Sequence, residues 1–208
     1  MTGEHAQFEP AEQQAIRDAV NAGEKAICPR DGAPMTSRAI GGGVALACLQ
    51  IAKLLGAYVT VTSGSDAKLE RAVALGADAT INHRGTDVGK EMRARTLKRG
   101  VDVVVDSVGE ATWSQSLGAL GRRGRLVTCG GTSGPMVTTD VRRLFWNQWS
   151  ILGSTMGSES EFQAIVAHFN AGRLRPPVDS VYPLADGREA FERMQNREQF
   201  GKLVMRVA

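Results

Sequence analysis

Apolar and polar positions switch repeatedly between a helical and a strand period from residue 43 to residue 157. Val44, Cys48, Ile51 and Leu55 recur at helical spacing, and the β-branched run "YVTVT" that follows them is typical of a strand. Further helices are predicted at 66–75, 88–97, 111–120 and 139–147, alternating with the strands "ATIN", "VDVVVD", "GRLVTCG" and "WSILGS". This alternation predicts an α/β fold with a Rossmann-like, doubly wound parallel sheet.

The pattern changes after Gly157. Phe162, Ile165 and Phe169 lie on one face of a predicted amphipathic helix, and the "RPPV" stretch marks its end. A strand "DSVYPL", a helix over 186–195 and a last strand "KLVMRV" follow. We therefore expect residues 158–208 to form a C-terminal helix–strand–helix–strand return.

The first forty residues have a different character from the rest. The run "PAEQQAIRDAVNAGE" predicts a short amphipathic helix with Ile16 and Val20 facing inward, and "CPRDGAPM" predicts a turn. Cys28 is a possible metal ligand there, but Asp31 stands where a zinc knuckle needs a second cysteine, so an ordinary turn is favoured. The predicted division is residues 1–40 as a separate helix plus turn, 41–157 as the Rossmann-like domain, and 158–208 as the return.

Composition narrows the class of protein. The chain has 208 residues, 42% of them hydrophobic, which suffices for a real core. No apolar run approaches the roughly 18 residues that span a bilayer, and the polar start is unlike a signal peptide. The three cysteines form no paired framework, which is typical of a reducing compartment, and the net charge of +3 is mild. We expect a cytoplasmic protein with no disulfide, no membrane partner and no nucleic-acid partner.

Three glycines, Gly41, Gly42 and Gly43, precede the first helix of the alternating region. Glycines let a phosphate approach the backbone, and the amides and dipole of a helix N-terminus attract it. The strand before the glycines is degraded, because "PMTSRAI" has Ser37 and Arg38 where a central parallel strand is normally apolar. The glycine run alone is as compatible with a flexible turn as with a dinucleotide site.

The end of the second strand, "TSGS", carries no acidic residue. A carboxylate at this place bonds the ribose hydroxyls of NAD and repels the extra phosphate of NADP. Hydroxyls here, with Lys68 one turn into the next helix, favour NADP(H) over NAD(H). Ser65 is also well placed to cap that helix, and the two roles are compatible.

From Gly41 to Ala208 the sequence resembles the cofactor domain of a medium-chain dehydrogenase/reductase, the superfamily of zinc-type alcohol dehydrogenases and quinone oxidoreductases. The matching stretches include "GGGVALACLQIAKLLGA", "SGSDAKLERAVALGAD", "GVDVVVDSVG", "GRLVTCGGTSG" and "QFGKLVMR". The resemblance implies a cofactor site in which Gly42, Gly43 and Val44 lie at the diphosphate; Ser63, Ser65 and Lys68 lie near the adenosine phosphate; Ser107, Val108 and Gly109 flank the cofactor; Cys129, Gly130 and Gly131 lie on the nicotinamide side; and Lys202 makes a C-terminal contact.

The same resemblance implies hydride transfer between NADP(H) and a carbonyl, enone or quinone, which is a small-molecule acceptor. The N-terminal catalytic domain of that superfamily does not precede Gly41, and residues 1–40 faintly resemble a small zinc-ribbon-type protein, so we expect a truncated or fused chain. No zinc is expected, and no general acid or base is nominated. The alternative function is a non-catalytic dinucleotide-binding or dimerisation module, with a homodimer formed through the strand near Ile151–Met156.

Two further groups of residues have alternative interpretations. His83 and His168 are expected to be surface residues. Four aromatic residues can be read as an acceptor pocket, although core or subunit packing is favoured at their spacing: Trp113, Phe145, Trp146 and Trp149.

Overall fold

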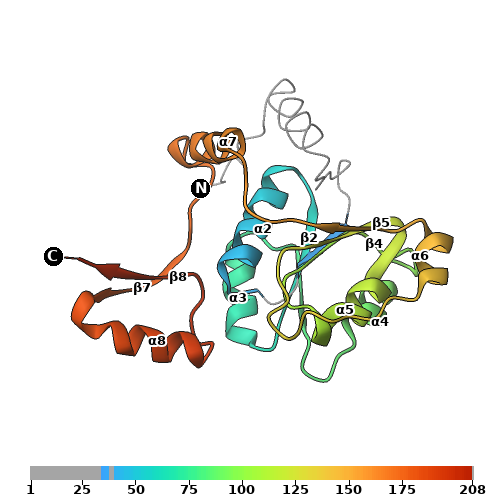
Figure 1. The fold of residues 1–208 in the computed structure, drawn as a ribbon, viewed down its shortest axis with the longest axis horizontal. Coiled ribbons are helices and arrows are strands. Elements are labelled where there is room, and N and C mark those ends of the chain that lie inside the picture. The colour runs from blue at the N-terminus through green and yellow to red at the C-terminus, as the bar shows by residue number, and fades with distance from the viewer. Residues whose placement is uncertain (1–33, 38–39, 208) are drawn as a thin grey trace.

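The computed structural model describes residues 34–37 and 40–207, and a six-stranded parallel sheet lies at its centre (Figure 1). The strands are β1 (Pro34–Ser37), β2 (Tyr58–Ser63), β3 (Ala79–Asn82), β4 (Val101–Asp106), β5 (Leu120–Thr128) and β6 (Ser150–Gly153). Their order is β3-β2-β1-β4-β5-β6, and every neighbouring pair is parallel. This order is that of a doubly wound Rossmann sheet, so the predicted fold class is confirmed.

Helices follow the strands and cover both faces of the sheet. They are α2 (Gly43–Leu54), α3 (Asp66–Ala74), α4 (Val88–Arg95), α5 (Glu110–Ala119) and α6 (Val141–Asn147). Val103 and Val105 of β4 belong to one hydrophobic cluster with α2 and α3, whereas Val104 belongs to a second cluster with α4 and α5. Successive strand residues point to opposite faces. The near-continuous apolar run of β4 is therefore explained by burial on both sides.

The first strand differs from the sequence-based expectation. Pro34–Ser37 lies at the centre of the sheet, where Thr36 pairs with Thr60 of β2 on one side and Val104 of β4 on the other. The expected domain boundary at residue 41 is therefore too late, because the sheet takes its first strand from within 1–40. Backbone hydrogen bonds to two neighbours do not require apolar side chains, which is why a short strand containing Thr36 and Ser37 can fill this position. The helix and the Cys28 turn expected earlier in the chain lie outside the described residues.

A second, smaller unit follows β6. Helix α7 (Glu159–Asn170) begins at Ser158, whose side chain forms a capping box with Glu161. The remaining elements are β7 (Val178–Pro183), the 3-10 turn η1 (Leu184–Asp186), α8 (Gly187–Gln195) and β8 (Lys202–Arg206). Strands β7 and β8 pair in parallel as a two-stranded sheet, with α8 as the crossover. Figure 1 shows this unit, orange to red, beside α3 and at the opposite end of the molecule from α6.

No helix within the described ranges is both long enough and apolar enough to span a bilayer.

Candidate functional site

The turn between β1 and α2 exposes the start of that helix. The Ile40 amide donates to the Thr62 carbonyl (2.7 Å), which fixes the turn against β2. Gly41 has φ +127°, a conformation that favours glycine. Gly42 caps the helix without a side-chain hydrogen bond, and a Cβ built on it would meet nothing within 4 Å. Gly42 and Val44 are exposed, so the start of α2 is accessible to solvent, as a phosphate-binding helix N-terminus requires.

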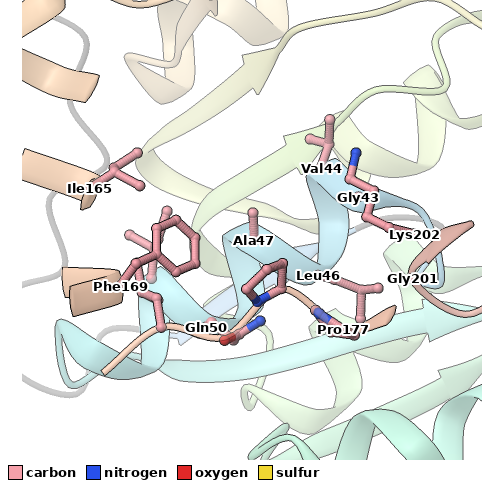
Figure 2. A pocket seen from close by; sticks show the side chains of 13 residues that line it. Gly43, Val44, Leu46, Ala47, Gln50, Ile165, Phe169, Pro177, Gly201 and Lys202 are labelled. Atoms are coloured by element: carbon pink, nitrogen blue, oxygen red, sulfur yellow. The ribbon is translucent and has the colours of Figure 1, made fainter. Parts of the chain in front are cut away.

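Lys202 of β8 reaches this helix start from the far end of the sequence. A Cβ built on Gly43 would lie 2.8 Å from Nζ of Lys202, so the ammonium group lies directly over that glycine. Figure 2 shows the lysine side chain pointing toward Gly43 and Val44 at the beginning of α2. The helix dipole and the ammonium charge thus act on the same point, where both attract an anion. The structure brings together the predicted residues Gly42, Gly43, Val44 and Lys202.

Lys68 of α3 lies closer to this turn than the sequence suggests. Its Nζ is 3.3 Å from the position of a Cβ on Gly41 and donates to the Arg197 carbonyl at 2.5 Å. Burial lowers the pKa of Lys68, and the nearby Asp179 carboxylate opposes this shift. Lys68 is predicted to lie near the adenosine phosphate, and in the structure its ammonium group donates a hydrogen bond to the C-terminal return. The Arg197 carbonyl that accepts this hydrogen bond is distant in sequence.

The end of β2 carries the predicted serines. Ser63 is buried, and its hydroxyl accepts a hydrogen bond from the Ser65 amide (3.1 Å). Ser65 is the N-cap residue of α3, but its side chain makes no capping hydrogen bond. Of the two roles considered for Ser65, helix capping by the hydroxyl is therefore not realised in the structure.

Two basic residues that the sequence analysis did not assign to the site lie beside this strand end. A Cβ built on Gly64 would lie 3.1 Å from Arg84 Nε and 3.1 Å from His83 Nε2. Both residues are exposed, as expected for His83. They follow β3, which neighbours β2 in the sheet, so the carboxyl ends of both strands meet at one edge. Placing β3 next to β2, as in a doubly wound sheet, would have predicted that Arg84 lies near the end of β2. The adjacent Asp66 carboxylate accepts a hydrogen bond from the Asn82 amide (2.7 Å).

The loop after β4 is organised by a buried carboxylate, Asp106, which has no exposed surface. It accepts hydrogen bonds from the Thr112 hydroxyl (2.7 Å), the Ser116 hydroxyl (2.6 Å), the Val108 amide (2.8 Å) and the Gly109 amide (3.2 Å). These bonds hold the start of α5 against the end of β4. Ser107, Val108 and Gly109 are consequently fixed in one conformation.

The loop after β5 packs on the loop after β4. A Cβ built on Gly130 would lie 3.1 Å from the Ser107 carbonyl oxygen, so a side chain there would require the two loops to shift by a few tenths of an ångström. The Val108 carbonyl accepts hydrogen bonds from the Ser133 amide (2.8 Å) and hydroxyl (2.7 Å). The predicted group from Ser107 to Gly109 and the predicted group from Cys129 to Gly131 are therefore neighbours. Both lie at the carboxyl edge of the sheet, the same edge as the glycine turn, which is where doubly wound sheets bind ligands.

The two described cysteines are free thiols with raised pKa values. Cys129 is exposed, and partial burial, followed by the Asp106 carboxylate, raises its pKa. Burial raises the pKa of Cys48 to about 11, with a smaller contribution from Cys129. Neither thiol is activated as a nucleophile at neutral pH.

An apolar cavity of about 350 Å³ extends from Lys202 along the outer side of α2 (Figure 2). Val44 and Ala47 form the α2 wall, and Ile165 and Phe169 of α7 form the opposite wall. The cavity therefore joins the glycine turn to the C-terminal return.

The aromatic residues do not form an acceptor pocket. Trp113 and Trp149 are core residues, each 7% exposed, and their indole N–H groups donate to Thr139 Oγ1 and the Gly121 carbonyl. Phe145 and Trp146 of α6 are 64% and 77% exposed. The favoured interpretation as packing residues thus holds for the two core tryptophans.

Two expectations concern histidine and metal binding. His168 was expected at the surface, but it is half-buried on α7.

Within residues 34–37 and 40–207, no group of three or more His, Cys, Asp or Glu side chains is arranged to hold a metal ion. These residues therefore do not fit a zinc site.

Sequence comparisons connect this geometry to known proteins. The profile of a family described as zinc-binding dehydrogenase matches residues 43–171. A zinc-type alcohol dehydrogenase-like protein of Schizosaccharomyces pombe is 35% identical over 175 residues, which are 80% of this chain and 49% of that protein. A quinone oxidoreductase of Salmonella typhimurium is 34% identical over 188 residues, 83% of this chain and 56% of that protein. The chain spans about half the length of these curated relatives.

Solved structures show the same similarity. An NAD-dependent alcohol dehydrogenase superimposes with a TM-score of 0.81 and 38% identity, covering 94% of this chain and 55% of that one. A mycobacterial protein complexed with NADPH superimposes with a TM-score of 0.75 and 27% identity, covering 90% of this chain and 62% of that one.

Proposed function

This chain belongs to the zinc-binding dehydrogenase family, and from that membership we propose that it acts in an oxidoreductase that binds NADP(H). The proposed reaction is hydride transfer to or from a carbonyl, an enone or a quinone. The family match over residues 43–171 confirms the predicted resemblance to medium-chain dehydrogenases/reductases. The observation that carries the proposal is the open start of α2, where free backbone amides and Lys202 converge on Gly43.

The residues of this chain perform the binding part of the reaction. The amides of the glycine turn and the Lys202 ammonium would hold the diphosphate, because each is positive and each faces the same point. The rigid pair of loops containing Val108 and Gly130 would form the wall on the nicotinamide side. NADP(H), when bound, supplies the hydride chemistry. The chain's contribution is therefore orientation, and no acid or base is assigned.

The preference for NADP(H) rests on the end of β2. The relatives include an NAD-dependent enzyme and a protein bound to NADPH, so the choice depends on this chain's own residues. Arg84 and His83 lie beside Gly64, and Ser65 leaves its hydroxyl free of the helix cap. An arginine at this place would form charge-assisted hydrogen bonds with the extra phosphate of NADP(H). Gly64 and Ser65, which follow β2, carry no carboxylate, and the next residue, Asp66, accepts a hydrogen bond from the Asn82 amide.

The experiment is a titration of the purified chain with NADPH and with NADH, followed by nicotinamide fluorescence. NADPH should bind more tightly, and it should raise the midpoint of thermal unfolding, because a ligand of the folded state stabilises it. Equal affinity for both dinucleotides would contradict the NADP(H) preference. Absence of binding would contradict the whole proposal.

The alternative function is dinucleotide binding without catalysis. It is favoured by one finding, which is that the chain spans about half the length of its curated relatives. Quinone and enone acceptors separate the two functions. NADPH oxidation with any of them supports the reductase, whereas binding without oxidation supports the non-catalytic module.

The proposed assembly is a homodimer in the cytoplasm, acting on a small-molecule acceptor. β6 forms one edge of the sheet, and the neighbouring helix α6 exposes Phe145 and Trp146. An open strand edge beside exposed aromatic rings is a suitable surface for a second copy, with residues Ile151–Met156 at the contact. Sedimentation of the chain and of a Trp146→Ser variant tests this, since only the first should dimerise.

A further inference from the structure

A buried carboxylate, Asp179 of β7, joins the C-terminal return to the dinucleotide-binding domain. Its side chain is 2% exposed. Oδ1 accepts hydrogen bonds from Arg71 of α3 (3.2 Å) and from the Phe200 amide (2.9 Å), and Oδ2 accepts one from Arg193 of α8 (2.9 Å). The Arg71 guanidinium also lies over the Phe200 ring, 4.4 Å from its centre. One carboxylate therefore ties three segments together that are distant in sequence.

The charge state of Asp179 follows from these contacts. Burial would raise its pKa, but the hydrogen bonds from Arg193, from the Phe200 amide, from the Ser180 hydroxyl and from Arg71 hold the pKa well below the usual range of a carboxyl group. The group is therefore ionised at neutral pH, which is the form that accepts all of its hydrogen bonds.

A short segment leads from this carboxylate to the glycine turn. Phe200 is 2% exposed and belongs to the same hydrophobic cluster as Leu46 of α2. The Gly201 amide donates to the Gly41 carbonyl (3.0 Å). Lys202 follows directly, and its own amide donates to the Pro177 carbonyl (2.8 Å). Its side chain therefore starts from a backbone that Asp179 holds through Phe200 and the glycine turn holds through Gly201.

The end of that side chain lies at the candidate diphosphate site, since Lys202 Nζ is 2.8 Å from the position of a Cβ on Gly43. We propose that Asp179 is a positioning residue for anion binding: by holding the Phe200 amide, Arg71 and Arg193, it fixes the segment that carries Lys202 over the start of α2. The proposal rests on the proposed dinucleotide function, and it adds a residue that touches neither the cofactor nor the glycine turn.

Charge and position have opposite effects when this carboxylate is removed. Asp179→Asn deletes a negative charge near Lys68, Arg71 and Arg193, so coulombic attraction alone would tighten the binding of a diphosphate. Loss of positioning weakens binding, because Lys202 then has to be ordered by the ligand itself. A purely structural role lowers stability and leaves the affinity of the folded protein unchanged. Tighter, weaker and unchanged binding therefore indicate a coulombic, a positioning and a purely structural role of Asp179, respectively.

The test is calorimetric titration of the full chain with NADPH and with inorganic pyrophosphate at fixed ionic strength. The variants are Asp179→Asn, Lys202→Met and the double variant, with Asp102→Asn as a control on the partly exposed ion pair to Arg99. We expect Asp179→Asn and Lys202→Met each to raise Kd by about tenfold, the effect of one charge-assisted hydrogen bond, and the control Asp102→Asn to leave Kd unchanged. Because Asp179 acts through Lys202, the double variant should bind no more weakly than Lys202→Met alone.

Unchanged or tighter binding by Asp179→Asn would overturn the proposal, as would additive losses in the double variant. Circular dichroism establishes that each variant is folded. Where Asp179→Asn fails to fold, Asp179→Glu keeps the charge and displaces the carboxylate by one methylene. It should also bind more weakly, and wild-type affinity in that variant would overturn the proposal.

The outcomes separate this inference from the proposed function. Pyrophosphate and NADPH binding with the expected double-variant result, but without oxidation by any acceptor, contradicts only the reductase proposal. Turnover together with additive losses contradicts only the role of Asp179. A chain that binds neither ligand contradicts both.

Discussion

Replacing Asp106 by alanine should destabilise the protein more than any substitution at an exposed carboxylate. The change removes the acceptor of four hydrogen bonds inside the β4–α5 connection, where Asp106 has no exposed surface. The Thr112 and Ser116 hydroxyls and two backbone amides are then left without their partner. Each buried donor left without an acceptor costs its full desolvation penalty, so the loss of stability exceeds the net contribution of the hydrogen bonds alone.

The magnitude follows from the number of donors. Hydrogen bonds to charged groups are each worth roughly 1.5–3 kcal/mol, and water entering the small space left by the carboxylate satisfies some of the donors again. We expect Asp106→Ala to lower the free energy of unfolding by about 4 kcal/mol. For a chain of this size, that corresponds to a fall in the thermal midpoint of about 8–16 °C.

Urea unfolding followed by circular dichroism measures this difference, and Asp102→Ala provides the matched control. Asp102 lies on the same strand, but its side chain is 33% exposed and pairs with Arg99, whose side chain is 56% exposed. Its removal should change the unfolding free energy by less than about 1 kcal/mol. Equal effects of the two substitutions would refute the reasoning, because burial would then make no difference.

Three further changes have defined outcomes. Arg84→Ala should reduce the ratio of NADPH to NADH affinity by about tenfold in parallel fluorescence titrations, and an unchanged ratio would remove Arg84 from the phosphate site. Gly109→Ala should destabilise the chain by more than about 2 kcal/mol, since φ is +89° and the new Cβ would lie 2.6 Å from the Gly134 carbonyl oxygen; thermal unfolding would show a midpoint close to wild type if this is wrong. Alkylation of Cys129 by iodoacetamide should be slow at pH 7 and accelerate as the pH rises past 9, because its pKa is raised and only the thiolate reacts. Cys48 should require a still higher pH. Peptide mapping that finds fast modification at pH 7 would contradict the raised pKa values.

The alternation of helices and strands was predictable because burial imposes it. The valines of the "VDVVVD" run are buried because β4 is covered on both faces. Helix α2 was recognised from the spacing of Val44, Cys48, Ile51 and Leu55, but its buried face consists of Ala45, Leu46, Leu49 and Ala52. The glycine turn was also recognisable, since Gly42 and Gly43 precede that helix directly. The helical period and the glycine turn are formed by residues close together in the sequence, so both can be recognised from the sequence alone.

The features that the sequence did not reveal depend on distant partners. Pro34–Ser37 was expected only as a degraded strand, and the sequence did not reveal its central position, because its place is set by backbone pairing with β2 and β4. Arg84 approaches Gly64 only because β3 lies beside β2. Lys68 turns toward Arg197, far along the chain. The assignment of these residues to a cofactor stays a prediction until a dinucleotide is titrated.

The central position of β1 has a consequence for how the chain assembles. Both of its partners are made after it, and Val103, which pairs with Met35, is synthesised only when about half of the chain is complete. Parallel pairing over such separations is slow, because a long loop has to close before any contact forms. The middle of the sheet is therefore among the last parts to assemble, and refolding should be limited by the docking of a four-residue strand between two halves that have already formed their own helices.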